Sequence, residues 1–232
     1  MAGATKLPDP ASDPGDDPFC ELRIYRVAAG RALDMESRVQ GDLRALFAKH
    51  GIRPHAGWST VVSPVAPAFI YLTPWQNMNQ RSASWAGFYS DPGWAEVRGR
   101  TNGSSELVES YEILFVRAIM PWRGGAETAV FSELIIQSCA IGKTVAVTAE
   151  LNQHTVPIIA GEGAQVHGVF DMMSGRPLPT LVMLVGWDSL EQRSAALARL
   201  DERAQANRAA GNPVLLERAE QHLMRHVPVA WA

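Results

Sequence analysis

The sequence has few cysteines, no long apolar stretch and no strong net charge. Its two cysteines, Cys20 and Cys139, belong to no Cys/His cluster with zinc-site spacing. We expect both thiols to be buried in strands and reduced, which is typical of a cytoplasmic protein. The apolar runs are all shorter than the roughly 20 residues that cross a bilayer. Because the formal charge is −3, we expect neither nucleic acid nor an anionic membrane as a partner.

Signatures of several large enzyme classes are missing as well. The sequence contains no Gly-x-Ser-x-Gly elbow of a serine hydrolase. Its Gly161-Glu162-Gly163 stretch precedes a predicted strand and not a helix, so it is not a dinucleotide-binding loop. Residues 1–18 contain four prolines, four aspartates and no apolar segment. We predict that they form a disordered tail and not a secretory signal.

What the sequence does contain is an internal repeat. Glu21 returns as Glu133 and Trp75 returns as Trp187, both at an offset of 112 residues. A constant offset marks a duplicated structural unit. We therefore divide the chain into a tail (1–18), a first unit (19–122), a linker (123–130) and a second, divergent unit (131–232).

Periodicity within each unit predicts the order β-α-β-β-α-β. We expect strands at 20–27, 56–62, 69–73 and 110–119, helices at 32–50 and 77–89, and a turn at 90–94. The second unit repeats this plan with strands at 131–138, 165–173, 180–185 and 216–226 and helices at 143–159 and 190–210.

This order is ferredoxin-like and belongs to the α+β class. One such sheet would leave an apolar face bare, which a monomer rarely tolerates. We therefore predict that the two units pack sheet to sheet as an internal pseudo-dimeric α+β barrel with four helices outside. Since the fusion supplies both halves, we expect a monomer.

Several short motifs resemble the NIPSNAP family, which belongs to the dimeric α+β barrel superfamily. They are Glu21-Leu22-Arg23-Ile24-Tyr25-Arg26-Val27, Gly57-Trp58, Tyr71-Leu72-Thr73-Pro74-Trp75 and Phe88-Tyr89-Ser90-Asp91-Pro92-Gly93-Trp94. The resemblance covers residues 19–122 and, through fewer positions, 131–232. It implies a fused pseudo-dimer. The family has no agreed catalytic motif to carry over, and the wider superfamily includes cofactor-free oxidation of aromatic polyketides, haem-dependent enzymes and lactone isomerases.

Alternation places Glu21, Arg23 and Tyr25 on one face of the first strand. We expect the opposite face, with Leu22 and Ile24, to meet the helices, so that the polar face points toward the partner sheet.

These polar residues are the candidate catalytic residues. Glu21 would act as a base, Arg23 would stabilise an oxyanion and Tyr25 would donate a hydrogen bond. The ferredoxin-like strand order places Tyr71 beside them as a substrate-binding residue. The alternative is a structural ion pair of Glu21 with Arg23 or Arg117 that holds the two sheets in register.

The second unit differs at two of these positions. Arg23 is replaced by Ile135 and Tyr25 by Gln137. The sequence therefore predicts a single site that depends on the first unit.

Three further residues are candidates for substrate binding. His55 and His167 lie near the starts of equivalent strands, and Trp58 follows on the first of these strands. The alternatives are polar strand ends for the histidines and the core for the tryptophan. No sequence pattern marks a histidine in an apolar haem pocket. We predict no cofactor and no metal.

The sequence leaves two functions open. The first is a small-molecule-binding barrel protein, a cofactor-independent enzyme acting on a hydrophobic or aromatic metabolite. The second is a non-catalytic protein-interaction module that binds through an exposed helix or the acidic tail. A polar-lined cavity above a few hundred Å³ would favour the first.

Overall fold

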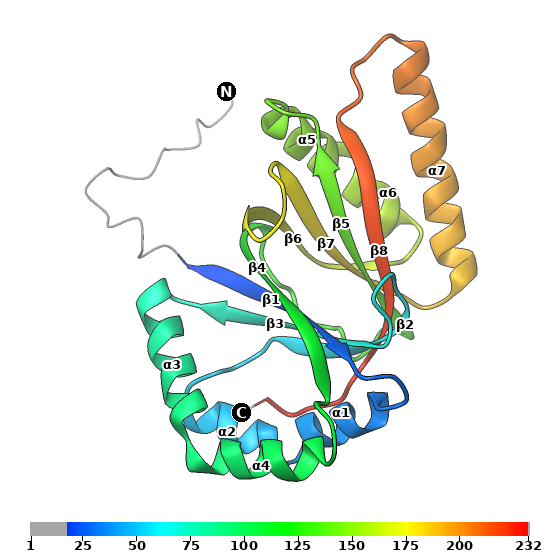
Figure 1. Cartoon of the computed structure of the whole chain (residues 1–232). Helices are drawn as coiled ribbons and strands as arrows, with labels where there is room; N and C mark the ends of the chain where they lie inside the picture. The colour runs from blue at the N-terminus through cyan, green and yellow to red at the C-terminus, as the bar shows by residue number, and fades with distance from the viewer. Residues whose placement is uncertain (1–17, 232) are drawn as a thin grey trace.

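The computed structural model describes residues 18–231 (Figure 1). The predicted disordered tail lies outside the described residues except for Pro18. The first half contains β1 (Phe19–Val27), α1 (Ala32–Arg38), a π-helical turn η1 (Val39–Leu43), α2 (Arg44–Lys49), β2 (Ala56–Val62), β3 (Ala68–Trp75), α3 (Met78–Ser90), α4 (Pro92–Asn102) and β4 (Val108–Met120). The second half contains β5 (Phe131–Cys139), α5 (Thr144–Glu150), η2 (Leu151–Thr155), α6 (Val156–Gly161), β6 (Gln165–Ser174), β7 (Thr180–Trp187), α7 (Leu190–Ala209) and β8 (Leu216–His226).

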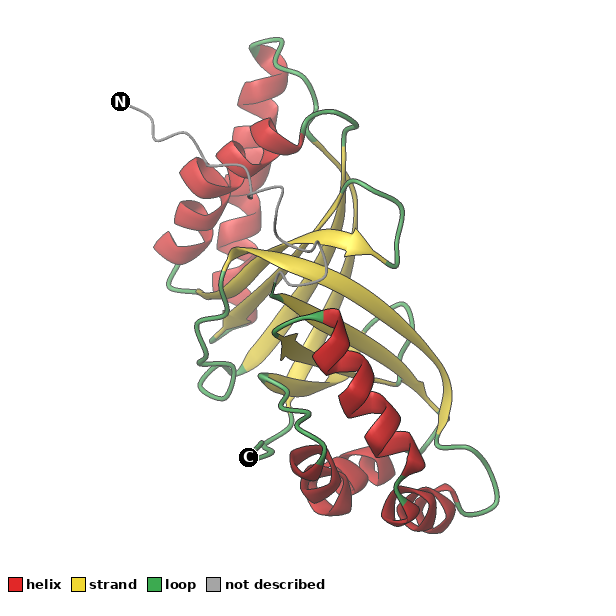
Figure 2. Ribbon diagram, turned by 90° about the vertical axis from the view of Figure 1, so that its left-hand side faces the viewer, coloured by secondary structure: helices red, strands yellow, loops and turns green. Residues whose placement is uncertain are grey.

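The eight strands form one closed antiparallel barrel in the order β1-β3-β2-β8-β5-β7-β6-β4. β1 lies between β3 and β4, as predicted, and β5 lies between β7 and β8. The pairs β2–β8 and β4–β6 join the two halves. The helices of the two halves lie at opposite sides of the barrel (Figure 2).

The repeat extends to an irregular feature of the first helix in each half. The helical segment after β1 is interrupted at Val39–Leu43 by a π-helical turn, and the segment after β5 at Leu151–Thr155. Both boundaries keep the offset of 112 residues that the sequence shows.

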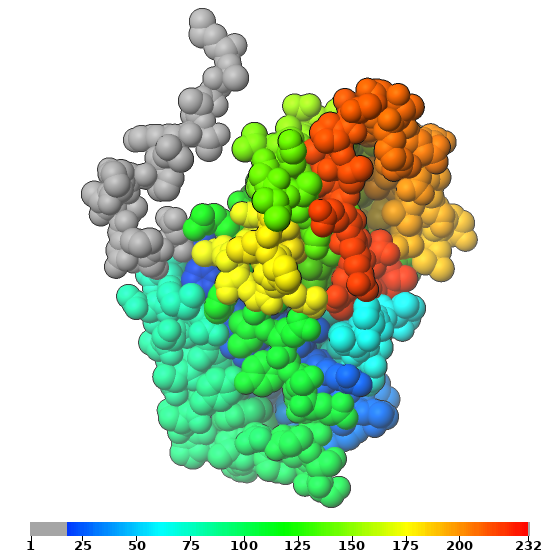
Figure 3. All heavy atoms as spheres, turned by 45° about the horizontal axis from the view of Figure 1, so that its top comes forward, coloured from blue at the N-terminus to red at the C-terminus, as the bar shows by residue number. Residues whose placement is uncertain are grey.

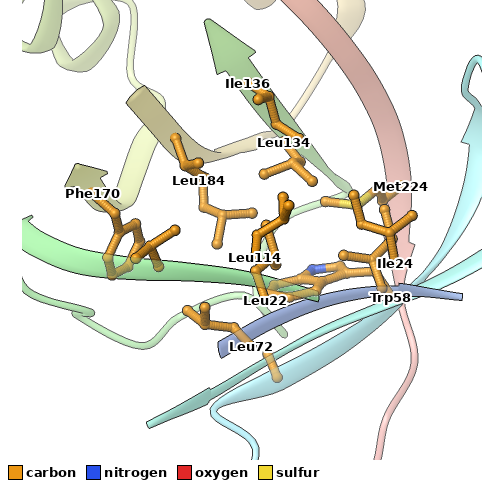
Figure 4. Packing of buried hydrophobic residues seen from close by; sticks show 14 of the residues in the cluster. Leu22, Ile24, Trp58, Leu72, Leu114, Leu134, Ile136, Phe170, Leu184 and Met224 are labelled. Atoms are coloured by element: carbon orange, nitrogen blue, oxygen red, sulfur yellow. The ribbon is translucent and has the colours of Figure 1, made fainter. Parts of the chain in front are cut away.

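The barrel interior is filled by apolar side chains from both halves (Figure 4). Leu22, Trp58 and Leu114 of the first half meet Leu134 and Leu184 of the second, and all five are fully buried. Each such side chain stabilises the fold by about 1.5–3 kcal/mol. The shared interior therefore holds the two halves together.

The predicted facing of β1 is wrong. Leu22 and Ile24 point into the barrel, whereas Glu21 and Arg23 lie on the outer face beneath the helices. The reason is that α3 supplies partners for the polar face: Arg81 for the carboxylate and an aromatic surface for the guanidinium. On the inner face, Leu22 and Ile24 join the apolar cluster of the barrel interior.

The predicted turn at 90–94 is also wrong, because it starts α4. Asp91 caps this helix by accepting a hydrogen bond from the Gly93 N–H at 2.8 Å, and Pro92 follows in the first turn. Both residue types are typical of a helix start. The second half has the single long helix α7 between β7 and β8.

Within the described range, no helix is long and apolar enough to cross a membrane. Cys20 and Cys139 lie in strands as free thiols, and burial raises the pKa of each to about 11.

Candidate functional site

A cavity of about 440 Å³ lies between the outer face of the first half's sheet and the helices that cover it. Its floor comes from β1 and β4, and its walls come from α1 to α4. It is lined by Arg23, Tyr25, Met35, Arg38, Leu43, Phe47, Arg81, Trp85, Phe88, Tyr89, Trp94, Arg98, Glu106, Val108, Tyr111 and Ile113.

Glu21 lies beneath this cavity, fully buried, and its carboxylate accepts five hydrogen bonds. Arg23 Nε donates at 2.5 Å, and Arg81 donates through Nε at 2.7 Å and Nη2 at 3.1 Å. The indole N–H groups of Trp75 and Trp85 donate at 3.0 and 3.2 Å. Burial alone would raise the pKa of Glu21, but the hydrogen bonds and charges of Arg81 and Arg23 outweigh it and lower the pKa.

Part of this arrangement is repeated in the second half. Glu133 accepts from Trp187 Nε1 at 3.0 Å and from Arg193 at 2.7 and 2.9 Å. The tryptophan follows the glutamate by 54 positions and the arginine follows it by 60 in both halves. The Glu-Trp-Arg cluster is therefore scaffold, and it ties a central strand to a helix.

Arg23 is specific to the first half and is 2% exposed. Its Nη1 donates to Tyr25 Oη at 2.8 Å and to Tyr89 Oη at 3.3 Å, and its guanidinium carbon lies 3.6 Å from the centroid of the Trp85 ring. Among residues 18–231, no hydrogen bond engages its Nη2. Burial disfavours the cation, but the neighbouring tyrosines and Glu21 raise the pKa of Arg23 above its ordinary value. Arg23 thus brings a permanent positive charge to the cavity.

The hydroxyl group of Tyr25 can donate a hydrogen bond to a ligand. Its oxygen accepts from Arg23 Nη1 and from Tyr71 Oη, which lies 2.9 Å away. A hydroxyl has two acceptor lone pairs and one proton. With both lone pairs occupied, its O–H is left to donate to another group. Burial raises the pKa of both Tyr25 and Tyr71, so both phenols stay protonated at neutral pH.

Aromatic rings surround these donors. Phe47 packs against Trp85 and Phe88 at centroid distances of 5.6 and 5.2 Å, and Trp94 lies 4.8 Å from Phe88. Such walls accept a flat apolar molecule through edge and stacking contacts.

The other predicted binding residues lie elsewhere. Trp58 is in the barrel interior and donates to Ser132 Oγ at 3.1 Å. His55 and His167 both pack against Trp122, at 5.4 and 5.5 Å between ring centroids. None of these three lines the cavity.

His167 is buried, and a backbone carbonyl group holds its ring. Its Nδ1 lies 2.8 Å from the carbonyl oxygen of Gly124, and its Nε2 has no partner in the described part of the chain. A Cβ at Gly186 would come within 2.5 Å of that Nε2, so the glycine makes room for the ring. Burial lowers the pKa of His167, which keeps the imidazole neutral.

The sequence placed Glu21, Arg23, Tyr25 and Tyr71 together, and the structure does so too. It missed Arg81, Trp85 and Tyr89, which come from α3. Arg81 was detectable, because Arg193 stands at the same spacing in the second half. Trp85 and Tyr89 have no counterpart there, and nothing in the pattern indicated which way α3 turns them.

The described residues that line the cavity include no histidine and no cysteine, two frequent axial ligands of haem iron. In the described range, no three histidine, cysteine, aspartate or glutamate side chains form a group that could hold a metal ion.

Comparison with known families gives two matches in this chain. The model of the NIPSNAP family matches residues 20–119 and again residues 132–231. No curated protein matches the sequence.

Solved structures show the same fold at low sequence identity. A monooxygenase-like protein from Lactobacillus acidophilus NCFM, described as putative, is 8% identical over 93% of this chain and 97% of its own, with a TM-score of 0.58. An anthrone oxidase-like protein is 11% identical over 92% of both chains, with a TM-score of 0.53. A chlorite dismutase variant from Candidatus Nitrospira defluvii is 10% identical over 90% of this chain and 92% of its own, with a TM-score of 0.53.

Proposed function

Because this chain belongs to the NIPSNAP family, as a tandem member, we propose its function from the cavity that its first half builds. The chain is a small-molecule-binding α+β barrel protein, formed from two ferredoxin-like units. The first cavity is the active site of a cofactor-independent enzyme that acts on a hydrophobic or aromatic metabolite.

One observation carries the proposal. Arg23 Nη2 and the Tyr25 O–H are two hydrogen-bond donors without partners in the described chain, and both residues line an aromatic cavity. Donors of this kind stabilise negative charge on a ligand oxygen. A phenol or an enolisable aromatic ketone has both a ring that can pack against the aromatic walls and an oxygen that can accept hydrogen bonds from the two donors.

The residues then divide into two roles. Arg23 and Tyr25 contact the ligand oxygen, with Tyr89 beside them. Glu21 fixes the guanidinium through Nε, and Tyr71 directs the Tyr25 proton by donating to its oxygen. All five hydrogen bonds to Glu21 hold its charge in place, so it acts as a positioning residue and not as a base.

The first chemical consequence is ionisation of the ligand. An opposite charge at hydrogen-bond distance lowers the pKa of an acid by about 1–3 units. The bound phenol or enol gives its proton to solvent and remains as the anion, which is the electron-rich form.

Binding of 4-nitrophenol tests this step, because its anion absorbs visible light. Titrated with protein, the ligand should ionise at a pH about one unit or more below its value in buffer. Arg23→Ile should remove that shift and weaken binding at least ten-fold. The melting temperature should change by only a few degrees, since Ile135 occupies the same position over an intact Glu133 cluster.

Arg26→Ile is the matched control, because Arg26 is on the same strand and is 56% exposed. It should leave the ionisation unchanged. Unfolding of the Arg23 variant would instead assign Arg23 to the scaffold, and an unshifted ligand pKa in the unaltered protein would refute the proposed oxyanion site.

Catalysis needs its own test, and the name of one structural neighbour suggests anthrone as the probe. The anthrone enolate should react with O₂ to give anthraquinone and water, one O₂ per anthrone, in protein treated with a chelator and desalted. We expect oxygen uptake above that of buffer and loss of the excess in the Arg23 variant. Binding without turnover of this or other enolisable ketones would leave the cavity as a binding site, and absence of both would favour the interaction module.

A further inference from the structure

A second cavity, of about 340 Å³, lies between the outer face of the second half's sheet and α7. Figure 3 shows α7 (orange) and β8 (red) side by side on the surface of this half. The cavity occupies the place that corresponds to the first one. Ile135 pairs with Met183 across β5 and β7, as Arg23 pairs with Tyr71 across β1 and β3.

At two positions of the sheet, the second half has apolar residues where the first half has polar ones. An isoleucine replaces Arg23 and a methionine replaces Tyr71. The deep lining is hydrophobic, with Ile135, Ile159, Met183, Leu197, Leu200 and Leu216. Exposed residues such as Val214 and Gln221 are also part of its lining, so a ligand can enter this space from solvent.

The buried charge at the floor is already neutralised. Glu133 is fully buried, and its two oxygens accept from Arg193 at 2.7 and 2.9 Å and from Trp187. The floor has no further cation beside this ion pair, because Ile135 stands at the position equivalent to Arg23.

The rim carries charges that face each other or water. Glu150 of α5 accepts from Arg203 of α7 at 2.5 and 2.9 Å. Asp201 and Arg208 also line the cavity at this rim, where both are exposed to water. At the floor, where Ile135 replaces Arg23, an ionised ligand group would have no cation beside it, and burying an unpaired charge is costly.

One polar atom at the floor is free. Gln137 Nε2 donates to the Glu217 carbonyl oxygen at 3.4 Å, and its Oε1 has no partner in the described chain. That oxygen lies at the position equivalent to Tyr25 and accepts a single hydrogen bond from a ligand.

We propose that the second cavity binds a neutral, medium-chain apolar molecule with one hydroxyl group, of the fatty-alcohol class. The chain fills the space under α7, and the hydroxyl donates to Gln137 Oε1. This site is independent of the function proposed for the first cavity, since the two share no lining residue.

Methionine methyl NMR with 1-decanol tests the proposal, because each cavity has one methionine in its lining. Met183 reports on the second cavity and Met35 on the first. Titration should shift the Met183 methyl signal to saturation and leave that of Met35 in place. Decanoate at neutral pH should bind at least ten-fold more weakly.

Leu197→Trp supplies the matched variant. It installs at this position the tryptophan that the first half has as Trp85, and so fills the cavity with a residue the scaffold accepts. Decanol should no longer shift Met183. Ala198→Trp, the same change on the exposed side of α7, should keep the response.

The proposal is overturned by any of three results. They are a Met183 signal that decanol does not shift, an equal affinity for decanoate, and decanol binding that survives in a folded Leu197→Trp protein. If that variant fails to fold, Ala204→Trp, from the same wall, replaces it with the same expected loss.

Discussion

Arg23 and Ile135 occupy one position of a scaffold that the chain builds twice. Beneath both, a buried glutamate accepts from a tryptophan and an arginine at the same spacing. The Glu-Trp-Arg cluster that both halves share holds the fold. Arg81 is therefore structural although it lines the cavity, whereas Arg23 and Tyr25, which only the first half has, are available for a ligand.

Glu21→Gln should destabilise the protein in a pH-dependent way. The pKa of Glu21 is below its ordinary value of 4.5 in the fold. Its contribution is therefore complete above about pH 4.5 and is lost as the pH falls through the folded pKa. At neutral pH the variant should lose about 3–5 kcal/mol, the cost of breaking a buried ion pair.

Urea unfolding at stepwise lower pH measures this. The difference between the unaltered protein and the variant should shrink below pH 4.5. Glu109→Gln, a half-exposed carboxylate on β4, is the control and should show little difference at any pH. If the difference in unfolding free energy between the two proteins stayed constant across the acid range, the Glu21 charge would not have this role.

The floor of the first cavity was predictable from the sequence, and its walls were not. Alternation along residues 20–27 put Glu21, Arg23 and Tyr25 on one face, and strand order brought Tyr71 beside them. The rings of Trp85 and Tyr89 depend on how α3 rotates over the sheet. That rotation is set by the Arg81–Glu21 ion pair, a contact between residues 60 positions apart.

At the scale of elements, α4 is the feature that the first half has and the second lacks. It adds Trp94 and Arg98 to the cavity wall. Asp91 joins it to α2, since its carboxylate also lies 2.6 Å from Lys49 Nζ and 2.7 Å from His50 Nε2. The sequence prediction took this segment as a turn, although Asp-Pro is equally the start of a helix.

Asp91→Ala should loosen α4 and with it the first cavity. The hydrogen bonds from Lys49, His50 and the Gly93 N–H lower the pKa of Asp91, so its stabilising effect is present at neutral pH and is lost only in strong acid. We expect the melting temperature to fall by a few degrees and hydrogen exchange to increase along Pro92–Asn102.

Asp188→Ala is a suitable comparison, because Asp188 precedes α7 and its cap is Ser189. It should leave exchange in α4 unchanged. Equal protection of α4 in the Asp91 variant would show that packing alone fixes this helix.

At the scale of the molecule, the repeat gave the strand order, and the closed barrel follows from it. Which face of β1 points into the barrel could not be predicted from the repeat. Both faces of β1 are buried in the structure, and burying the polar face under helices is favourable only because Arg81 of α3 pairs with Glu21. The interior instead collects apolar residues from all eight strands, among them Leu22, Leu72, Leu134 and Leu184.

We expect the chain to be a monomer in solution. The seams β2–β8 and β4–β6 close the barrel within one chain. The exposed side of α7 carries Arg199 and Glu202, and charges are depleted in the cores of interfaces. Light scattering at micromolar concentration should give a mass near 25.3 kDa; a value near twice that mass would show self-association.

Closure within one chain also changes how the two cavities can evolve. In an assembly of identical subunits, every substitution appears in each copy, so a change that suits one cavity is imposed on the other. Here position 23 and position 135 are encoded separately. One half can keep an apolar, stabilising residue at this position while the other acquires a charged one. Arg23 in β1 and Ile135 at the equivalent position of β5 are an example of such independent change.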